Sequence, residues 1–171
     1  GTREKVYQQS NIKKGLATNR FYTITSVGKG NALSCGASTS IDQSGKITWS
    51  LARTNSASPN LIWLLENRDG KTYLYNPQSD SYFTGTASAK TTSLCDKASA
   101  PAWEIECVDE GKARYTFNMN GSGQYINSYN ATETGLWSGG SSDANNLWTV
   151  EELETIDIVI PSSGYYLGCS P

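Results

Sequence analysis

The sequence contains no histidine among its 171 residues. Ser-His-Asp triads, Cys-His pairs and His-ligated metal sites are therefore excluded within this chain. Any general acid or base would have to be a carboxylate, a tyrosine or a lysine. The loop carboxylates do not form the dense oxygen-ligand pattern of a calcium site. They are Asp42, Asp69, Asp80 and Asp143. We therefore expect neither a metal nor a cofactor.

Charged residues are also scarce, at 18% of the chain against roughly 25% in ordinary domains. The formal net charge is -2, so no broad basic surface is available for nucleic acid or anionic lipid. No apolar run approaches the roughly 18 residues that a membrane-spanning helix needs. We expect no nucleic-acid partner and no membrane span.

Small polar residues are abundant instead: Ser, Thr, Asn and Gly account for 68 of the 171 residues. Aromatic residues make up 11%, including five Trp and ten Tyr, which argues against disorder. The length suits one domain, and the composition is typical of an all-β protein with short strands and polar turns. With only one Met and few Lys, the composition also favours an exported bacterial protein, either secreted, periplasmic or at the cell surface.

Four cysteines are present, and none forms a Cys-x-x-Cys pair that would indicate a zinc or thioredoxin-type motif. They are Cys35, Cys95, Cys107 and Cys169. Three disulfide pairings are possible, and the sequence does not choose among them. The simplest interpretation is that most of them are small buried hydrophobic residues.

A tryptophan recurs in three similar segments, residues 60–66, 101–106 and 145–151. Each segment places its Trp in a short alternating run that ends in Glu. Trp63, Trp103 and Trp148 are 40 and 45 residues apart, which indicates an internal repeat. Because the position repeats, we expect these three indoles to be structural core residues.

Three further strands are predicted upstream of each recurring tryptophan. The opening strands are 21–24, 72–75 and 114–117, the second 32–35, 82–85 and 125–128, and the third about 47–51, 93–95 and 135–137. Asp-Gly and Asn-Gly pairs at the joints favour hairpins. Three four-stranded repeats sharing one core predict a pseudo-threefold β-trefoil, in which six strands form a barrel and three hairpins cap one end.

We expect this trefoil domain to span residues 20–153, with a short extension at each end. Residues 1–19 carry Val6, Ile12 and a C-cap candidate at Gly15, which suggest one short helix. Residues 154–171 alternate Ile with other residues around 156–160, which is typical of a strand.

The stretch 136–149 resembles a repeat of the ricin-type lectin family. That family ends its repeats in Gln-x-Trp, and Asn146, Leu147 and Trp148 match the motif here. The resemblance implies a β-trefoil that binds carbohydrate without catalysis, as a monomer or a module of a larger protein. In such a site an aromatic ring stacks on the apolar face of a sugar, and side chains around it bond the hydroxyls.

Carried over by position, the resemblance implies sugar-binding roles for residues in two of the repeats. They are Asn127, Trp137, Asn145 and Asn146 in the third repeat, and Ser34, Trp49 and Asn60 in the first. The matching positions of the second repeat hold Thr84, Leu94 and Ala100, which cannot provide a stacking ring and amides. We therefore expect no sugar-binding site in the second repeat. Neutral Asn or Ser replaces the family's acidic residue, so we expect neutral rather than charge-assisted hydrogen bonds.

Other interpretations compete with this one. Trp49 and Trp137 could instead be buried under the hairpin cap. The carboxylate pairs Glu104 with Glu106 and Glu152 with Glu154 could serve hydrolysis, but such spacing on a strand is the ordinary solvated pattern. A protein-binding trefoil, such as a protease inhibitor or an adhesion domain, would use a loop within 36–46 or 54–59.

Overall fold

The structure is a computed structural model that describes residues 12–13, 16–35, 48–51, 59–153 and 155–159. Strands dominate this part of the chain, which contains four short 3-10 helices and no α-helix. The strands are β1 (Ile12–Lys13), β2 (Phe21–Ser26), β3 (Thr48–Leu51), β4 (Trp63–Arg68), β5 (Lys71–Asn76), β6 (Ser81–Thr86), β7 (Thr91–Cys95), β8 (Trp103–Asp109), β9 (Arg114–Met119), β10 (Tyr125–Ser128), β11 (Thr134–Trp137), β12 (Trp148–Glu152) and β13 (Thr155–Val159). The 3-10 helices are η2 (Pro59–Leu61), η3 (Lys97–Ser99), η4 (Gly140–Ser142) and η5 (Ala144–Asn146).

One sheet of eleven strands closes on itself. Its order is β1-β8-β9-β10-β11-β7-β6-β5-β4-β2-β12, and β12 also pairs with β9. The first and last strands of the three repeats are β2 and β4, β5 and β8, and β9 and β12. β2 pairs with β4, and β9 pairs with β12. We call the three repeats units one, two and three in chain order. The β6–β7 and β10–β11 hairpins belong to units two and three. The all-β class and the three repeats confirm the predicted β-trefoil.

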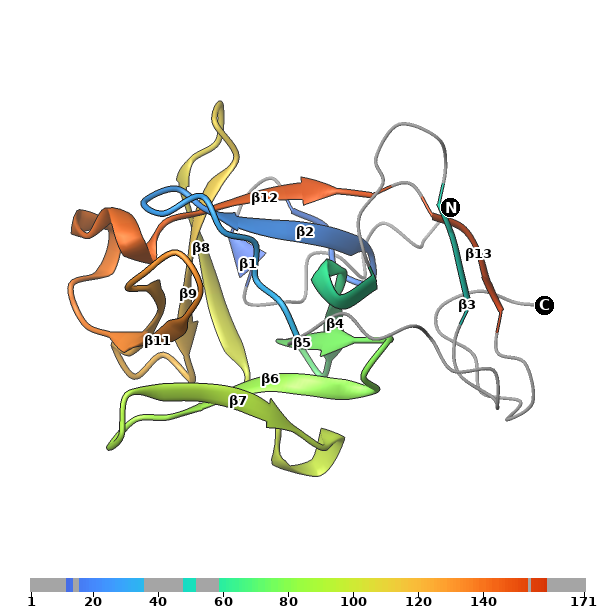
Figure 1. Ribbon diagram of the computed structural model, residues 1–171, viewed down its shortest axis with the longest axis horizontal. Coiled ribbons are helices and arrows are strands. Elements are labelled where there is room, and N and C mark those ends of the chain that lie inside the picture. The colour runs from blue at the N-terminus through green and yellow to red at the C-terminus, as the bar shows by residue number, and fades with distance from the viewer. Residues whose placement is uncertain (1–11, 14–15, 36–47, 52–58, 154, 160–171) are drawn as a thin grey trace.

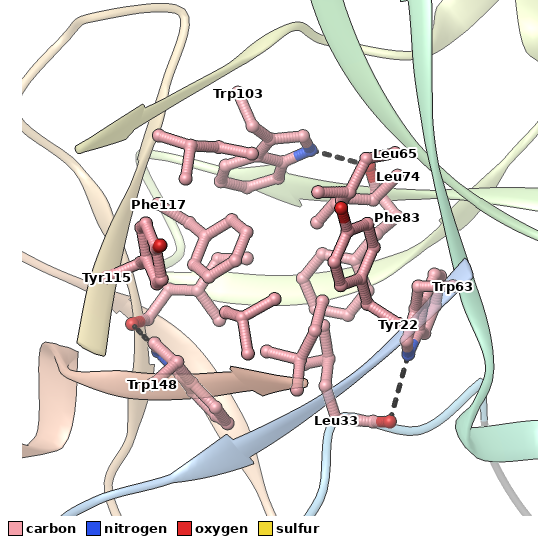
Figure 2. Close-up of a cluster of buried hydrophobic side chains, with 14 of the residues drawn as sticks. Tyr22, Leu33, Trp63, Leu65, Leu74, Phe83, Trp103, Tyr115, Phe117 and Trp148 are labelled. Carbon is pink, nitrogen blue, oxygen red and sulfur yellow. Dashed lines mark hydrogen bonds between the residues drawn. The ribbon is translucent and has the colours of Figure 1, made fainter. Parts of the chain in front are cut away.

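The core is organised around the three recurring tryptophans, each fully buried (Figure 2). The indole N–H of Trp63 donates to the carbonyl of Leu33, 2.9 Å away. Trp103 donates to Phe83 at 3.2 Å and Trp148 to Ile126 at 2.9 Å. All three acceptors occupy the second position of the predicted segments 32–35, 82–85 and 125–128. The repeat therefore places the indole and its hydrogen-bond partner three times, and it confirms the structural role of these tryptophans.

A polar side chain in the last or second-last position of each opening strand holds the turn that follows. Ser26 Oγ accepts from the backbone N–H of Lys29 at 3.0 Å, and Asn76 Oδ1 accepts from Ser79 at 2.8 Å. In unit three, Asn118 Oδ1 accepts from Gly123 at 2.8 Å. Asn and Ser serve here because a short side chain can reach the backbone of its own turn. This accounts for part of the chain's small polar composition.

The threefold pattern is least regular in unit one. The segment 32–35 contacts β2 through a single bridge between Thr25 and Ala32. The third strand predicted at 47–51 is present as β3, but it pairs with β13 in a separate two-stranded sheet. In Figure 1 these two strands lie side by side, apart from the closed sheet. Trp49 lies in β3, opposite Ile158.

The N-terminal extension differs from the helix expected there. Ile12 and Lys13 form β1, which pairs in parallel with Ile105 and Glu106 of β8. Backbone hydrogen bonding to an edge strand thus overrides the weak helical pattern at these two positions. The rest of the predicted helix lies outside the described residues. At the other end, the strand expected around 156–160 is present as β13.

Candidate ligand-binding site

A cavity of about 400 Å³ opens on unit three, between the β10–β11 hairpin and the helices η4 and η5. Its polar and aromatic lining comes from Asn127, Tyr129, Trp137, Asp143, Asn145 and Lys90. The cavity therefore brings together three residues that the sequence proposed as one site: Asn127, Trp137 and Asn145.

The hairpin register sets the shape of this cavity. Asn127 of β10 lies opposite Gly135 of β11, and Tyr125 lies opposite Trp137. A Cβ atom at Gly135 would lie only 2.7 Å from the carbonyl oxygen of Lys90 and 3.2 Å from the Tyr129 ring. Glycine is needed at this position because the backbone of unit two approaches so closely.

The amide of Asn127 is oriented by its neighbour Asn146. Asn146 is fully buried, and its Nδ2 donates to the carbonyls of Ser138 at 3.1 Å and Gly140 at 2.9 Å. Its Oδ1 is then the acceptor for Asn127 Nδ2, at 2.9 Å. In the described structure Asn127 thus uses its nitrogen internally. The structure places Asn146 beneath the site as a support, rather than in the cavity lining.

Asn145 is positioned from two sides. Its backbone N–H donates to Asp143, whose side chain caps the start of η5 at 2.9 Å. Its side-chain Oδ1 lies against Gly28, where a Cβ atom would collide with it. The turn after β2 therefore contributes a glycine that makes room for Asn145, although this turn belongs to unit one.

The aromatic side chains of the site are unusually open. The exposed fraction is 50% for Trp137 and 52% for Tyr129, whereas the three core tryptophans are 0% exposed. The ammonium of Lys90 lies 5.1 Å from the centroid of the Trp137 ring. Partial desolvation and the nearby Glu133 carboxylate raise the pKa of Tyr129, so its phenol is neutral at physiological pH. The site thus offers ring faces, neutral amides, one ammonium and one carboxylate.

The residues proposed in unit one are only partly brought together. Asn60 Nδ2 donates to Ser34 Oγ at 3.1 Å, and the backbone of Asn60 accepts from Cys35 at 2.9 Å. Trp49 lies in the separate β3–β13 sheet, and its side chain lies outside the described residues. Of the residues proposed in unit one, the described structure therefore brings Ser34 and Asn60 together.

Unit two offers no ring at the matching position. Thr84 lies opposite Ser93, and Leu94 lies opposite Phe83 and packs partly against the core. Ala100 follows η3 and packs against a second cluster of buried side chains. Nothing in this set resembles the unit-three cavity. That unit two lacks a sugar-binding site stays a prediction, which rests on the types of these three residues.

Three of the polar and aromatic lining residues are not in the set proposed from the sequence: Lys90, Tyr129 and Asp143. Asp143 had a local signal, because an Asp two residues before Asn145 can cap a short helix. Tyr129 directly follows β10, which places it at the mouth of the hairpin. Lys90 had no local signal at all, since it reaches the cavity from unit two.

The described cysteines, Cys35, Cys95 and Cys107, are free thiols, and Cys169 lies outside the described residues. Burial raises the pKa of Cys35 and Cys95, which keeps both protonated at neutral pH. Within the described ranges, no three Cys, Asp or Glu side chains are grouped so that they could hold a metal ion. No helix found there is long and apolar enough to cross a membrane.

No protein-family model matches the sequence, and no curated protein matches it. Solved structures do match the fold. A designed protein with threefold symmetry, ThreeFoil, gives a TM-score of 0.55 at 16% identity over 77% of this chain and 97% of that one. The ricin B-like lectin of Macrolepiota procera, solved with lactose, gives 0.58 at 17% identity over 81% of this chain and 99% of that one.

A third match is part of a larger enzyme. The endo-β-galactosidase of Clostridium perfringens that releases GlcNAcα1-4Gal gives a TM-score of 0.57 at 18% identity. The match covers 79% of this chain and 33% of that one. At these identities the comparisons establish the shared fold: the chain is a β-trefoil protein.

Proposed function

We propose that this protein is a non-catalytic carbohydrate-binding module whose site is the cavity of unit three. The observation that carries the proposal is the half-exposed Trp137 ring beside the amides of Asn127 and Asn145. A pyranose has an apolar C–H face and a rim of hydroxyls, so a ring next to neutral amides suits it. A cavity of about 400 Å³ is of the size of small-ligand sites.

Each side chain has a distinct role in this proposal. Trp137 provides the stacking face. Asn127, held by Asn146, accepts from a sugar hydroxyl, and the Asn145 amide can both donate and accept. Asp143 supplies the carboxylate that is missing at position 127, although it comes from η5 rather than from β10.

The fold comparisons support the proposal through the activities of the similar proteins. One of these is a lectin solved with lactose, and another is a galactosidase in which the match covers a third of the chain. We therefore infer that this protein works as a binding module, either alone or within a longer exported protein. An export location rests on composition, and a unit-one site rests on sequence position alone.

Titration with a panel of methyl glycosides tests the proposal. Binding is followed in two-dimensional NMR spectra through the backbone amide signals, which remain available in every variant, and through the indole N–H signal of the half-exposed Trp137, which should shift in the wild type. Trp137→Ala should abolish binding, whereas Val108→Ala, a change at another exposed apolar side chain outside the cavity, should leave it intact. Binding that survives Trp137→Ala, or no glycan binding at all, would overturn the proposal.

A further inference from the structure

The cap hairpins of units two and three are joined by their backbones where Lys90 lies. The N–H of Leu136 donates to the Lys90 carbonyl at 3.1 Å, and Thr91 pairs with Gly135. Thr92 Oγ1 also donates to the Thr134 carbonyl at 3.1 Å. The Cα of Lys90 is therefore held next to the strand that carries Trp137, even though it belongs to the neighbouring repeat.

The side chain of Lys90 brings a positive charge to the ring on which a sugar would stack. Its ammonium lies 5.1 Å from the Trp137 centroid, within the roughly 6 Å range of cation–π contacts. The contact is exposed and thus weak, and the flexible lysine stem lets the ammonium move to the edge of the ring when a ligand enters. There it is a charged hydrogen-bond donor in a cavity whose other donors are neutral.

Two carboxylates must be weighed against this positive charge. Asp143 lines the cavity, but its side chain accepts from Asn145 N–H on the η4–η5 side, whereas Lys90 enters from the β6–β7 hairpin. Glu133 is engaged by Asn130 Nδ2 at 2.8 Å, in the turn before β11. Position 127 carries a neutral amide, so no carboxylate on β10 repels an anion. Lys90 and Asp143 therefore reach the cavity from different elements, and Glu133 lies beside Tyr129.

We infer that the site recognises an acidic sugar, a residue bearing a carboxylate, and that Lys90 is its specificity-determining residue. The inference rests on the proposed function of the same cavity. The ligand carboxylate pairs with Lys90 at the edge of Trp137, and the sugar hydroxyls donate toward Asp143. A charge-assisted bond of this kind selects a uronic acid over the matching neutral hexose.

The test compares methyl galacturonoside with methyl galactoside, and methyl glucuronoside with methyl glucoside, as matched pairs. Dissociation constants are measured by NMR titration for wild type, Lys90→Gln, Lys90→Arg and Trp137→Ala. Lys97→Gln serves as a control, because Lys97 is an exposed lysine of unit two that does not line the cavity.

In wild type we expect at least one acidic sugar to bind about three- to fivefold more tightly than its neutral partner, which is the upper range for an exposed ion pair. Lys90→Gln should bring the ratio to about one, while Lys90→Arg and Lys97→Gln retain it. Raising the salt concentration should shrink the ratio. Equal affinities in wild type, or a ratio unchanged in Lys90→Gln, would overturn the inference. If Trp137→Ala still removes neutral-sugar binding in that case, the proposed function stands.

Discussion

Asn127 and Asn146 share a hydrogen bond of 2.9 Å that links the second strand of unit three to the helix before its tryptophan. Asn146 lies two residues before the buried Trp148, and its side-chain nitrogen also donates hydrogen bonds to two backbone carbonyls. The repeat motif therefore joins the core to the site: the same short segment buries an indole and orients the amide at the base of the cavity.

Asn146→Asp should destabilise the fold strongly. A carboxylate would place an acceptor against the carbonyls of Ser138 and Gly140, inside a fully buried position. We expect a loss of about 2–4 kcal/mol in the free energy of unfolding, since buried polar atoms would lose both partners. Asn145→Asp is the matched control, because Asn145 is partly exposed, and it should change stability by less than about 0.5 kcal/mol. Urea denaturation of the two variants measures the contrast, and equal losses would refute it.

Trp148→Phe should destabilise the fold strongly, whereas Trp137→Phe should leave its stability almost unchanged. The first leaves the Ile126 carbonyl without its indole donor and opens space in the core, so we expect a loss of about 2–4 kcal/mol. The second removes no buried bond and should alter stability by less than about 0.5 kcal/mol. Chemical denaturation followed by circular dichroism gives both values. A stable Trp148→Phe would mean that the recurring indole bond does not support the core.

The fold could be predicted because its main signal is repeated. Trp63, Trp103 and Trp148 are 40 and 45 residues apart. This regular spacing indicates three repeats that share one core. The pairing of β3 with β13 could not be predicted, because strand partners distant in the sequence leave no local pattern. The two-residue strand β1 was likewise hidden, since its partner β8 is about ninety residues away.

Some residues of the candidate site could likewise be predicted from the sequence, and others could not. Asn127, Trp137 and Asn145 could be proposed because the resemblance to a ricin-type repeat implies their roles by position, and the structure brings them to one cavity. Lys90 was not found, because a backbone contact between two hairpins brings it to the cavity. The role of Asn146 as a support rather than a lining residue depends on two carbonyls that only the folded chain aligns.

Stability should fall at alkaline pH through Tyr115. Burial, with a smaller contribution from Cys107, raises the pKa of Tyr115 to about 12, against about 10 in the unfolded chain. The folded state then keeps a proton that the unfolded state releases, so the stabilisation is complete below pH 10 and is lost as the pH rises from 10 toward 12. We expect a loss of about 1–2 kcal/mol over this window.

Tyr115→Phe isolates this contribution from the other tyrosines. The variant cannot ionise at this position, so its melting temperature should decline less between pH 9.5 and 11.5 than that of the wild type. Tyr73→Phe serves for comparison, because Tyr73 is only partly buried. Parallel declines in wild type and Tyr115→Phe would show that Tyr115 does not control the alkaline transition.

Gly135→Ala should damage both the fold and the site. The new methyl group would lie 2.7 Å from the Lys90 carbonyl, which is backbone and cannot swing away, and 3.2 Å from the Tyr129 ring. We expect a loss of about 1–3 kcal/mol, with the two cap hairpins pushed apart and glycan binding weakened. Gly111→Ala provides the control, because its nearest neighbour, Asp109 Oδ1, is 3.5 Å away, an ordinary contact distance. Thermal denaturation and glycan titration of both variants measure the difference. If Gly135→Ala is as stable as Gly111→Ala and binds glycan equally well, the close approach of Lys90 does not shape the cavity.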